Sequence, residues 1–226
     1  SSALPEAVNG VITLTEDVEL AKTFVVAEGT TLTIDLNGKT VIRKDETNQY
    51  ALRNLGTLTI QDTKGNGSIN ARGIYNGYGD GGANVATAKI IVLSGTINAK
   101  GTNGGAAIFN YGVADIQGGN FTSIGGYSLN NQSGASMTIA AGVTANNGIY
   151  ASGATLVVNG GEINGNRSGC HVLYAWNSNV TIAGGTFHNN NAGNATVFAS
   201  GSSVITIEDG TFYNDRTNNA YCTHLM

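Results

Sequence analysis

Carboxylates are the side chains of this chain that could catalyse cleavage of a glycosidic bond. Hydrolysis by the usual route needs two carboxyl groups on either side of that bond, about 5 to 9.5 Å apart. In the strand register described below, Asp115 and Glu162 both point outward, but they lie two coils and one strand apart. Glu208 and Asp209 are adjacent at a turn and cannot converge on one bond. We therefore expect no catalytic residues, although a fragment of a polysaccharide-degrading enzyme stays an alternative.

The residues that could bind a metal ion lack the required spacing. The three histidines, His171, His188 and His224, fall in different coils and form no metal-ligand pattern. The segment Asp62–Gly67 begins like a calcium-binding loop, but Lys64 occupies a ligand position and Gly73 stands where the bidentate glutamate belongs. We expect no metal site and no cofactor.

A short apolar pattern that recurs along the chain predicts the elements that position these residues. Two apolar residues separated by one position are followed five residues later by another, as in Val180, Ile182 and Phe187. A recurrence of about twenty to thirty residues is typical of stacked solenoid coils. The pattern divides the chain into about nine coils, which are 11–29, 30–56, 57–88, 89–112, 113–134, 135–153, 154–178, 179–202 and 203–226.

Each coil is predicted to contain three short strands. Alternating apolar residues mark them, as in Val180–Ile182, Thr186–His188 and Val197–Ala199, and Gly, Asn and Ser between them supply the turns. Equivalent strands of successive coils can then stack in parallel, about 4.8 Å apart. The 33 glycines suit tight corners, and the single proline, Pro5, precedes the repeats. The fold class is therefore all-β, a parallel β-helix of about nine coils.

The two ends of the repeat array differ. Residues 1–10 are expected to form an amino-terminal cap, in which Leu4–Val8 covers interior apolar groups and open sheet edges of the first coil. The β-helix domain spans residues 11–226. No amphipathic or charged segment follows the ninth coil, so we expect this domain to be part of a longer chain or of an oligomer.

Two segments of the repeat resemble the coils of a known protein family. Residues 31–40 (TLTIDLNGKT) and 180–187 (VTIAGGTF) are similar to coils of right-handed parallel β-helices of the pectin-lyase-like superfamily. Within it, residues 11–226 most resemble repeats of bacterial surface adhesins and of phage tail or head-fibre proteins. The resemblance implies an extracellular location on a bacterial cell surface or a virion, a frequent carbohydrate partner and, among the phage members, a homotrimer.

The same superfamily contains polysaccharide lyases, which need clustered aspartates for calcium beside an exposed Arg or Lys base. Residues 101–200 hold only three charged side chains, Asp115, Glu162 and Arg167, and do not supply that set.

The composition also argues against two kinds of partner. A net charge of −4 with 11 basic residues does not provide the clustered positive charge that binds a nucleic-acid backbone. No run approaches the roughly twenty apolar residues that span a bilayer, so we expect no membrane insertion.

The third strand of each coil carries the feature that points to binding. We expect the first apolar residue of this strand and the residue two positions later to point inward: Ile108 and Asn110, Leu129 and Asn131, Ile149 and Ala151, Leu173 and Ala175, Val197 and Ala199. Their neighbours then point outward and are mostly aromatic: Phe109, Tyr111, Tyr150, Tyr174, Trp176 and Phe198. The row is interrupted at Asn130 and Gln132, and Arg53 extends it toward the amino end.

An exposed aromatic row on a stiff sheet suits sugars, because flat rings stack on sugar faces while nearby amides and hydroxyls bond to the sugar hydroxyls. Two alternatives are a homo-oligomer contact and cover by the long corner from Arg72 to Asn84. We predict a non-enzymatic β-helix that serves as a rigid adhesive or receptor-binding scaffold and contacts a polysaccharide or cell-surface glycan through this row. A tailspike-like depolymerase fragment and a purely structural fibre segment are the other interpretations.

Overall fold

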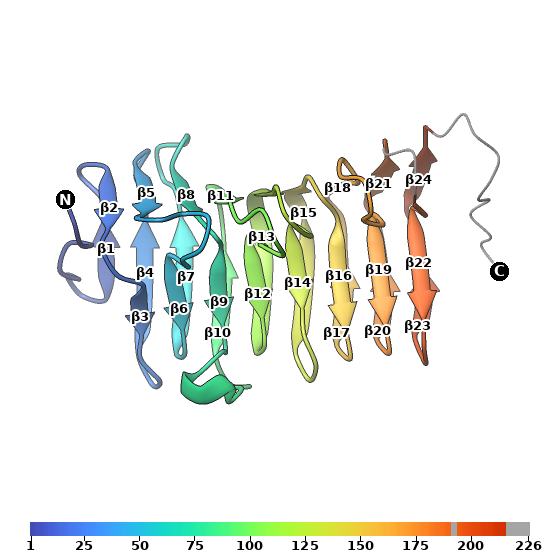
Figure 1. Ribbon diagram of the computed structural model, residues 1–226, viewed down its shortest axis with the longest axis horizontal. Coiled ribbons are helices and arrows are strands. Elements are labelled where there is room, and N and C mark those ends of the chain that lie inside the picture. Colours follow the sequence, from blue (N-terminus) through green and yellow to red (C-terminus); the bar gives the residue numbers. More distant parts are fainter. Residues whose placement is uncertain (191–193, 216–226) are drawn as a thin grey trace.

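The protein is a parallel β-solenoid of about eight turns with almost no helix. The computed structural model describes residues 1–190 and 194–215. Figure 1 shows the coils stacked along one axis, from the amino end in blue to the carboxyl end in red. The pairs between named strands are all parallel, as predicted for a β-helix.

Each complete turn supplies strand segments at three positions. The first position holds β1 (Val11–Thr13), β4 (Thr31–Asp35), β7 (Thr57–Gln61), β10 (Lys89–Val92), β17 (Thr155–Val158), β20 (Asn179–Ile182) and β23 (Val204–Ile207). The second holds β2 (Val18–Leu20), β5 (Thr40–Arg43), β8 (Ser68–Ala71), β11 (Thr96–Ala99), β18 (Glu162–Asn164), β21 (Thr186–Asn189) and β24 (Thr211–Asn214). Two longer strands, β13 (Val113–Ser123) and β15 (Ser136–Ala145), run through both positions and join them into one 16-stranded sheet.

The third position forms a separate eight-stranded sheet. Its strands are β3 (Phe24–Val26), β6 (Leu52–Asn54), β9 (Ile74–Asn76), β12 (Ile108–Asn110), β14 (Leu129–Asn131), β16 (Ile149–Ser152), β19 (Leu173–Trp176) and β22 (Val197–Ser200). The ninth predicted coil contributes β23 and β24, and its residues 216–226 lie outside the described part of the chain.

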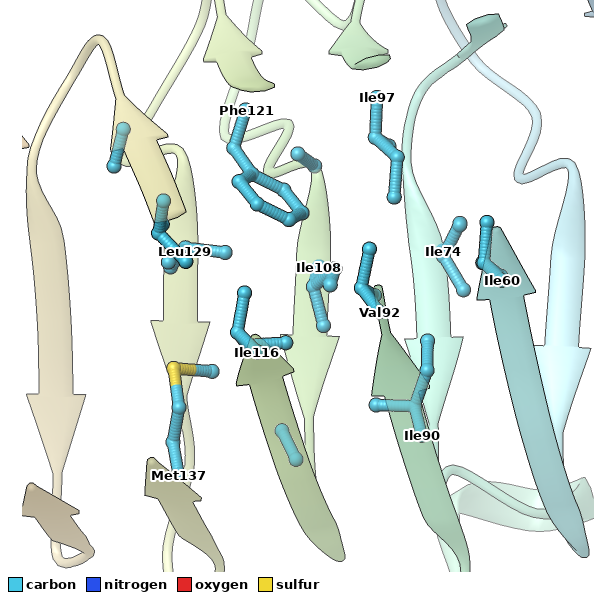
Figure 2. Packing of buried hydrophobic residues seen from close by; sticks show 14 of the residues in the cluster. Ile60, Ile74, Ile90, Val92, Ile97, Ile108, Ile116, Phe121, Leu129 and Met137 are labelled. Carbon is cyan, nitrogen blue, oxygen red and sulfur yellow. The ribbon is translucent and has the colours of Figure 1, made fainter. Parts of the chain in front are cut away.

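The core is a column of apolar side chains enclosed by the coils. In Figure 2 the side chains of Ile90, Val92, Ile116 and Phe121 point into this shared interior, and each is at most 1% exposed. The predicted inward orientation is confirmed for Ile108, Leu129, Ile149 and Leu173, which are all fully buried. Ala199, also predicted to point inward, is exposed, because β22 is the end strand of its sheet.

Four of the inward residues on the third strands are asparagines. Asn54, Asn76, Asn110 and Asn131 are 0% exposed, and each of the first three donates from Nδ2 to Oδ1 of the next at 2.7 to 2.8 Å. Their amides also bond backbone groups at the following corner; Asn110, for example, donates to the Gly112 carbonyl and accepts from the Gly112 N–H. The row provides hydrogen-bond partners for backbone groups at the corner where the third strand of one coil leads into the first strand of the next.

Two buried carboxylates hold a different corner. Asp35 accepts hydrogen bonds from the backbone N–H groups of Asn37 and Thr63 and from the Thr63 hydroxyl. Asp62 accepts from the N–H groups of Gly38 (2.7 Å) and Gly67 (2.6 Å). The Asp62 carboxylate therefore closes the turn between β7 and β8 through Gly67, and it links this turn to the preceding coil through Gly38.

The corner from Arg72 to Asn84 contains more regular structure than the sequence suggested. It begins with β9, and it continues into a short 3₁₀ turn, η1 (Asp80–Gly82). Gly73 makes the entry to β9 possible: its φ is +143°, and a Cβ there would stand 1.8 Å from the Ala106 carbonyl oxygen of the next coil.

Residues 1–10 lie against the first coil without forming a helix. The carbonyl groups of Ser1 and Ser2 accept hydrogen bonds from the N–H groups of Glu19, in β2, and of Ala21, which follows it. Leu4 packs partly buried against the core, and Val8 is 70% exposed. Within the described part of the chain, no helix has the length and hydrophobicity to cross a bilayer.

Candidate functional site

The outward residues of the eight-stranded sheet form one column in strict register. The column runs Val25, Arg53, Tyr75, Phe109, Asn130, Tyr150, Tyr174 and Phe198. Neighbouring rings in it have centroids 5.1 to 5.4 Å apart, close to the spacing of adjacent strands. Parallel stacking of the coils thus places side chains from distant parts of the sequence in one line along the rod.

The aromatic side chains divide into two clusters on either side of Asn130 and Gln132. The amino-terminal aromatic cluster comprises Tyr50, Tyr75, Tyr78, Phe109 and Tyr111. The carboxyl-terminal aromatic cluster comprises Tyr127, Tyr150, His171, Tyr174, Trp176 and Phe198. The interruption that the sequence predicted therefore separates two groups of rings that have different surroundings.

In the amino-terminal aromatic cluster the rings cover one another. Tyr75 stacks on Tyr50, with 3.9 Å between centroids, and on Tyr78, with 4.8 Å. The guanidinium carbon of Arg72 lies 5.6 Å from the centre of the Tyr50 ring. Burial, a hydrogen bond with Tyr50 and the nearby tyrosines raise the pKa of Tyr75, so its hydroxyl stays protonated at neutral pH. Both faces of Tyr75 are occupied, which leaves only its edge for a ligand.

Tyr78 belongs to the corner after β9, and it also packs against Tyr111 of the next coil, 5.0 Å between centroids. Burial, together with the neighbouring tyrosines, raises the pKa of Tyr111. The corner after β9 therefore contributes a ring that packs against Tyr111.

The carboxyl-terminal aromatic cluster is held by contacts from the preceding corners. His171 stacks on Phe198 with 4.3 Å between centroids and 5° between planes, and its Nδ1 accepts the Ala195 N–H at 3.0 Å. Burial lowers the pKa of His171. Tyr127 stacks on Tyr150 at 5.5 Å, and its hydroxyl accepts the His171 N–H at 3.2 Å. These contacts fix the rings around Tyr174.

Trp176 is the ring of this face with the most freedom to accept a ligand. It is 46% exposed, and within residues 1–190 and 194–215 its one ring contact is a tilted one with Tyr174, 6.5 Å between centroids. Its backbone is fixed, since its carbonyl accepts hydrogen bonds from the Gly153 N–H and the Ser178 hydroxyl. In the ladder it stands between Ser152 and Ser200, so a hydroxyl side chain occupies the matching position on each neighbouring strand.

The residues predicted from the sequence lie on this face, but in unequal environments. Phe109, Tyr111, Tyr150 and Tyr174 are half-buried, whereas Trp176 and Phe198 are 46% and 39% exposed. The structure brings Tyr150, Tyr174, Trp176 and Phe198 together and places Phe109 and Tyr111 in the other cluster. The exposed part of the predicted row is therefore confined to its carboxyl-terminal end.

Five side chains of the two clusters were missed from the sequence, although a repeat position marks four of them. Tyr75 occupies in Ile74–Asn76 the place that Phe109 occupies in Ile108–Asn110. Three others stand two residues before the first inward residue of a third strand: Tyr50 before Leu52, Tyr127 before Leu129 and His171 before Leu173. Only Tyr78, which reaches the face through a longer corner, has no such repeat position.

The ionisable residues considered for catalysis and metal binding have other partners. Asp115 on β13 accepts from the Gln117 amide at 2.9 Å, and Glu162 on β18 accepts from the Asn164 amide at 3.2 Å. His188 lies 2.7 Å from Asp215, and His224 is outside the described residues. Among residues 1–190 and 194–215 no group of three or more His, Cys, Asp or Glu side chains could hold a metal ion.

The comparisons with known proteins give this chain no relative. No protein-family model matches it, and neither a curated protein nor a solved structure does.

Proposed function

We propose that this chain is a non-enzymatic, rigid scaffold that binds polysaccharide through the carboxyl-terminal aromatic cluster. The observation that carries the proposal is the exposed indole of Trp176, which lies between Ser152 and Ser200 on the two neighbouring strands. An indole face stacks on the apolar face of a sugar ring, and serine hydroxyls can bond to its hydroxyl groups. Phe198, 39% exposed on the next coil, offers a second apolar surface one strand further along the rod.

In this proposal the polysaccharide binds to an open surface whose backbone does not rearrange on binding. The backbone of this face lies in a continuous parallel ladder, so a ligand orders few side chains when it binds. One stacked sugar gives weak affinity, whereas a polysaccharide that repeats along the rod adds several such contacts on one chain. We infer an extracellular setting, on a bacterial cell surface or a virion, from the resemblance of the coils to adhesin and phage-fibre repeats.

A binding screen with matched variants tests the proposal. The chain and its Trp176→Ala and Phe198→Ala variants are tested against bacterial and plant polysaccharides, with emission from Trp176, the single tryptophan, as one readout for the native chain. Removal of either ring is expected to weaken binding about tenfold. Tyr213→Ala is the control, because Tyr213 is 53% exposed but lies on β24, outside the eight-stranded sheet.

The other interpretations correspond to other outcomes of the same screen. Absence of saturable binding to every polysaccharide, or equal losses in Tyr213→Ala, contradicts the proposal. Shortening of a bound polysaccharide would favour a depolymerase fragment. A trimeric mass together with a Trp176 that is inaccessible to a soluble quencher would favour a structural fibre segment.

A further inference from the structure

The imidazole of His171 lies against one of the two exposed rings of the proposed binding surface. It is parallel to the ring of Phe198, with 4.3 Å between centroids and 5° between planes. It also meets Tyr174 edge to face, 5.4 Å between centroids, and Tyr174 in turn contacts Trp176. One titratable ring therefore supports Phe198 and the neighbour of Trp176 at the same time.

A hydrogen bond joins the same imidazole to the segment that leads into the Phe198 strand. The Ala195 N–H donates to Nδ1 of His171 at 3.0 Å, two residues before β22 begins at Val197. β22 is the end strand of its sheet and, within the described part of the chain, pairs with β19 alone. Because an end strand lacks the second ladder that holds an inner strand, its position depends more on contacts at its ends.

Protonation of His171 would remove this support without unfolding the coil. The neutral ring accepts a hydrogen bond at Nδ1, whereas the protonated ring carries a hydrogen on both nitrogens and cannot accept one. Two donors would then face each other across 3.0 Å, so the imidazolium must turn away from Ala195 and from the parallel Phe198 ring. The main-chain bond from the Leu173 N–H to the Thr196 carbonyl, 2.9 Å, does not involve the imidazole and is kept.

The groups that face His171 do not stabilise its charged form. Tyr174 meets the ring from β19, and the Tyr127 hydroxyl accepts the main-chain N–H of His171 at 3.2 Å. The preceding residue, Cys170, accepts from Nη1 of Arg167 at 3.1 Å, so positive charge already lies beside this corner. In the described part of the chain no carboxylate oxygen lies within 4.0 Å of a His171 ring nitrogen. In agreement with this environment, burial lowers the pKa of His171.

We propose that His171 is a positioning residue whose neutral ring holds Phe198 in place for a polysaccharide, and whose protonation in mild acid releases that polysaccharide. This role rests on the proposed function for the identity of the ligand, and it adds the regulation of that site by pH. Since binding of the proton and binding of the polysaccharide oppose each other, each must weaken the other by the same factor. We expect a factor of about ten, the effect of one lost hydrogen bond, and therefore a His171 titration midpoint about one pH unit lower in the complex.

The first part of the test needs no ligand. The His171 ring, the Ala195 amide and the Phe198 ring of the ¹³C,¹⁵N-labelled chain are followed by NMR from about pH 8 to about pH 4.5. The two ring signals are identified by their absence from the spectra of His171→Asn and Phe198→Leu. We expect all three groups to change with one shared midpoint, below about 6.5.

The second part measures polysaccharide affinity over the same pH range. The probe is the neutral polysaccharide that binds most tightly in the screen, because a charged one would add its own titration. Affinity for the native chain is expected to fall about tenfold as the pH drops through the His171 midpoint. His171→Asn keeps a hydrogen-bond acceptor near the place of Nδ1 but does not titrate, so its affinity is expected to stay constant over the range. His188→Asn is the matched control: His188 lies on β21, outside the eight-stranded sheet, and its loss is expected to leave the pH dependence unchanged.

The outcomes separate this role of His171 from the proposed function. A Phe198 ring signal that does not follow the His171 titration overturns the role, and so does a pH dependence of binding that persists in His171→Asn. Saturable binding that is independent of pH supports the proposed function and contradicts its regulation. Absence of binding to every polysaccharide at neutral pH contradicts the proposed function and the release of a ligand, while the shared midpoint in the ligand-free chain still decides whether His171 positions Phe198.

Discussion

The side-chain amide of Asn76 donates to Oδ1 of Asn110 across 2.7 Å, in the middle of four fully buried asparagines from successive coils. The sequence positions of these two residues are 34 apart, yet they occupy the same place on adjacent third strands. Their chain of hydrogen bonds ties the sheet that carries the aromatic face to the corners below it. The position of the face along the rod therefore depends on polar contacts inside the core.

Substitution of one asparagine in this row is expected to destabilise the fold strongly. Asn110→Ala removes one of the acceptors of Asn76 Nδ2 and the donor to Asn131 Oδ1, and it removes both bonds to Gly112. Buried groups that lose their hydrogen bonds each cost about 1 to 3 kcal/mol, so we expect a loss of about 2 to 4 kcal/mol in the free energy of unfolding. Urea denaturation measures it. The control Asn130→Ala changes an adjacent, outward and half-buried asparagine and is expected to cost less than about 1 kcal/mol.

Stability is expected to fall in acid because of Asp35. Burial alone would raise the pKa of this carboxyl group, but hydrogen bonds from Thr63, Asn37 and Gln61 outweigh it and lower the pKa. The folded chain thus binds the proton less tightly than the unfolded chain. The contribution of the carboxylate is complete above the unfolded pKa of about 3.9 and is lost as the pH falls through the lower folded value.

Urea unfolding of the native chain and of Asp35→Asn over this pH range measures the effect. We expect the variant to be less stable near neutral pH and the difference between the two proteins to shrink in acid. A difference that stays constant down to about pH 2 would show that the charge of Asp35 does not contribute.

His171 is expected to make the carboxyl-terminal aromatic cluster sensitive to mildly acidic pH. Its pKa is lowered by burial, and its Nδ1 must be unprotonated to accept the Ala195 N–H. The unfolded chain therefore binds the proton more tightly, so stability falls as the pH drops below about 6.5 until the folded-state pKa is passed. An NMR titration of the ring is expected to give a midpoint below 6.5. Loss of the same pH dependence in His171→Gln supports the assignment, and an unchanged dependence contradicts it.

Tyr78 is expected to fasten the corner that follows β9 to the aromatic face. Its ring contacts Tyr75 and Tyr111, and such ring pairs are worth about 0.5 to 1.5 kcal/mol each. We expect Tyr78→Ala to increase amide hydrogen exchange in residues 77–86 by about 10- to 100-fold, measured by mass spectrometry. Tyr78→Phe keeps the ring and should exchange like the native chain. Equal exchange in all three proteins would mean that the backbone bonds of this corner, such as Gly79 N–H to Ala83 carbonyl, hold it alone.

The alternation of apolar residues along the sequence determines much of the face. With a side-chain period of two, the inward positions of Ile108 and Asn110 place Phe109 outward, and the same holds for Tyr150 and Tyr174. The repeat also predicted parallel stacking and the gap at Asn130. What it could not predict was the contribution of Tyr78, because this residue reaches the face through a longer corner and has no equivalent position in the other coils.

The sequence by itself determined the class of fold and the column to which each outward residue belongs, since both follow from a periodic pattern and the steric rules of strands. Only the tertiary structure decided which rings are available. Tyr75 and Trp176 are both outward on third strands, but corner residues cover both faces of Tyr75 and leave Trp176 46% exposed. The exposure of a side chain depends on what packs against it from other coils, and a local pattern contains no record of those contacts.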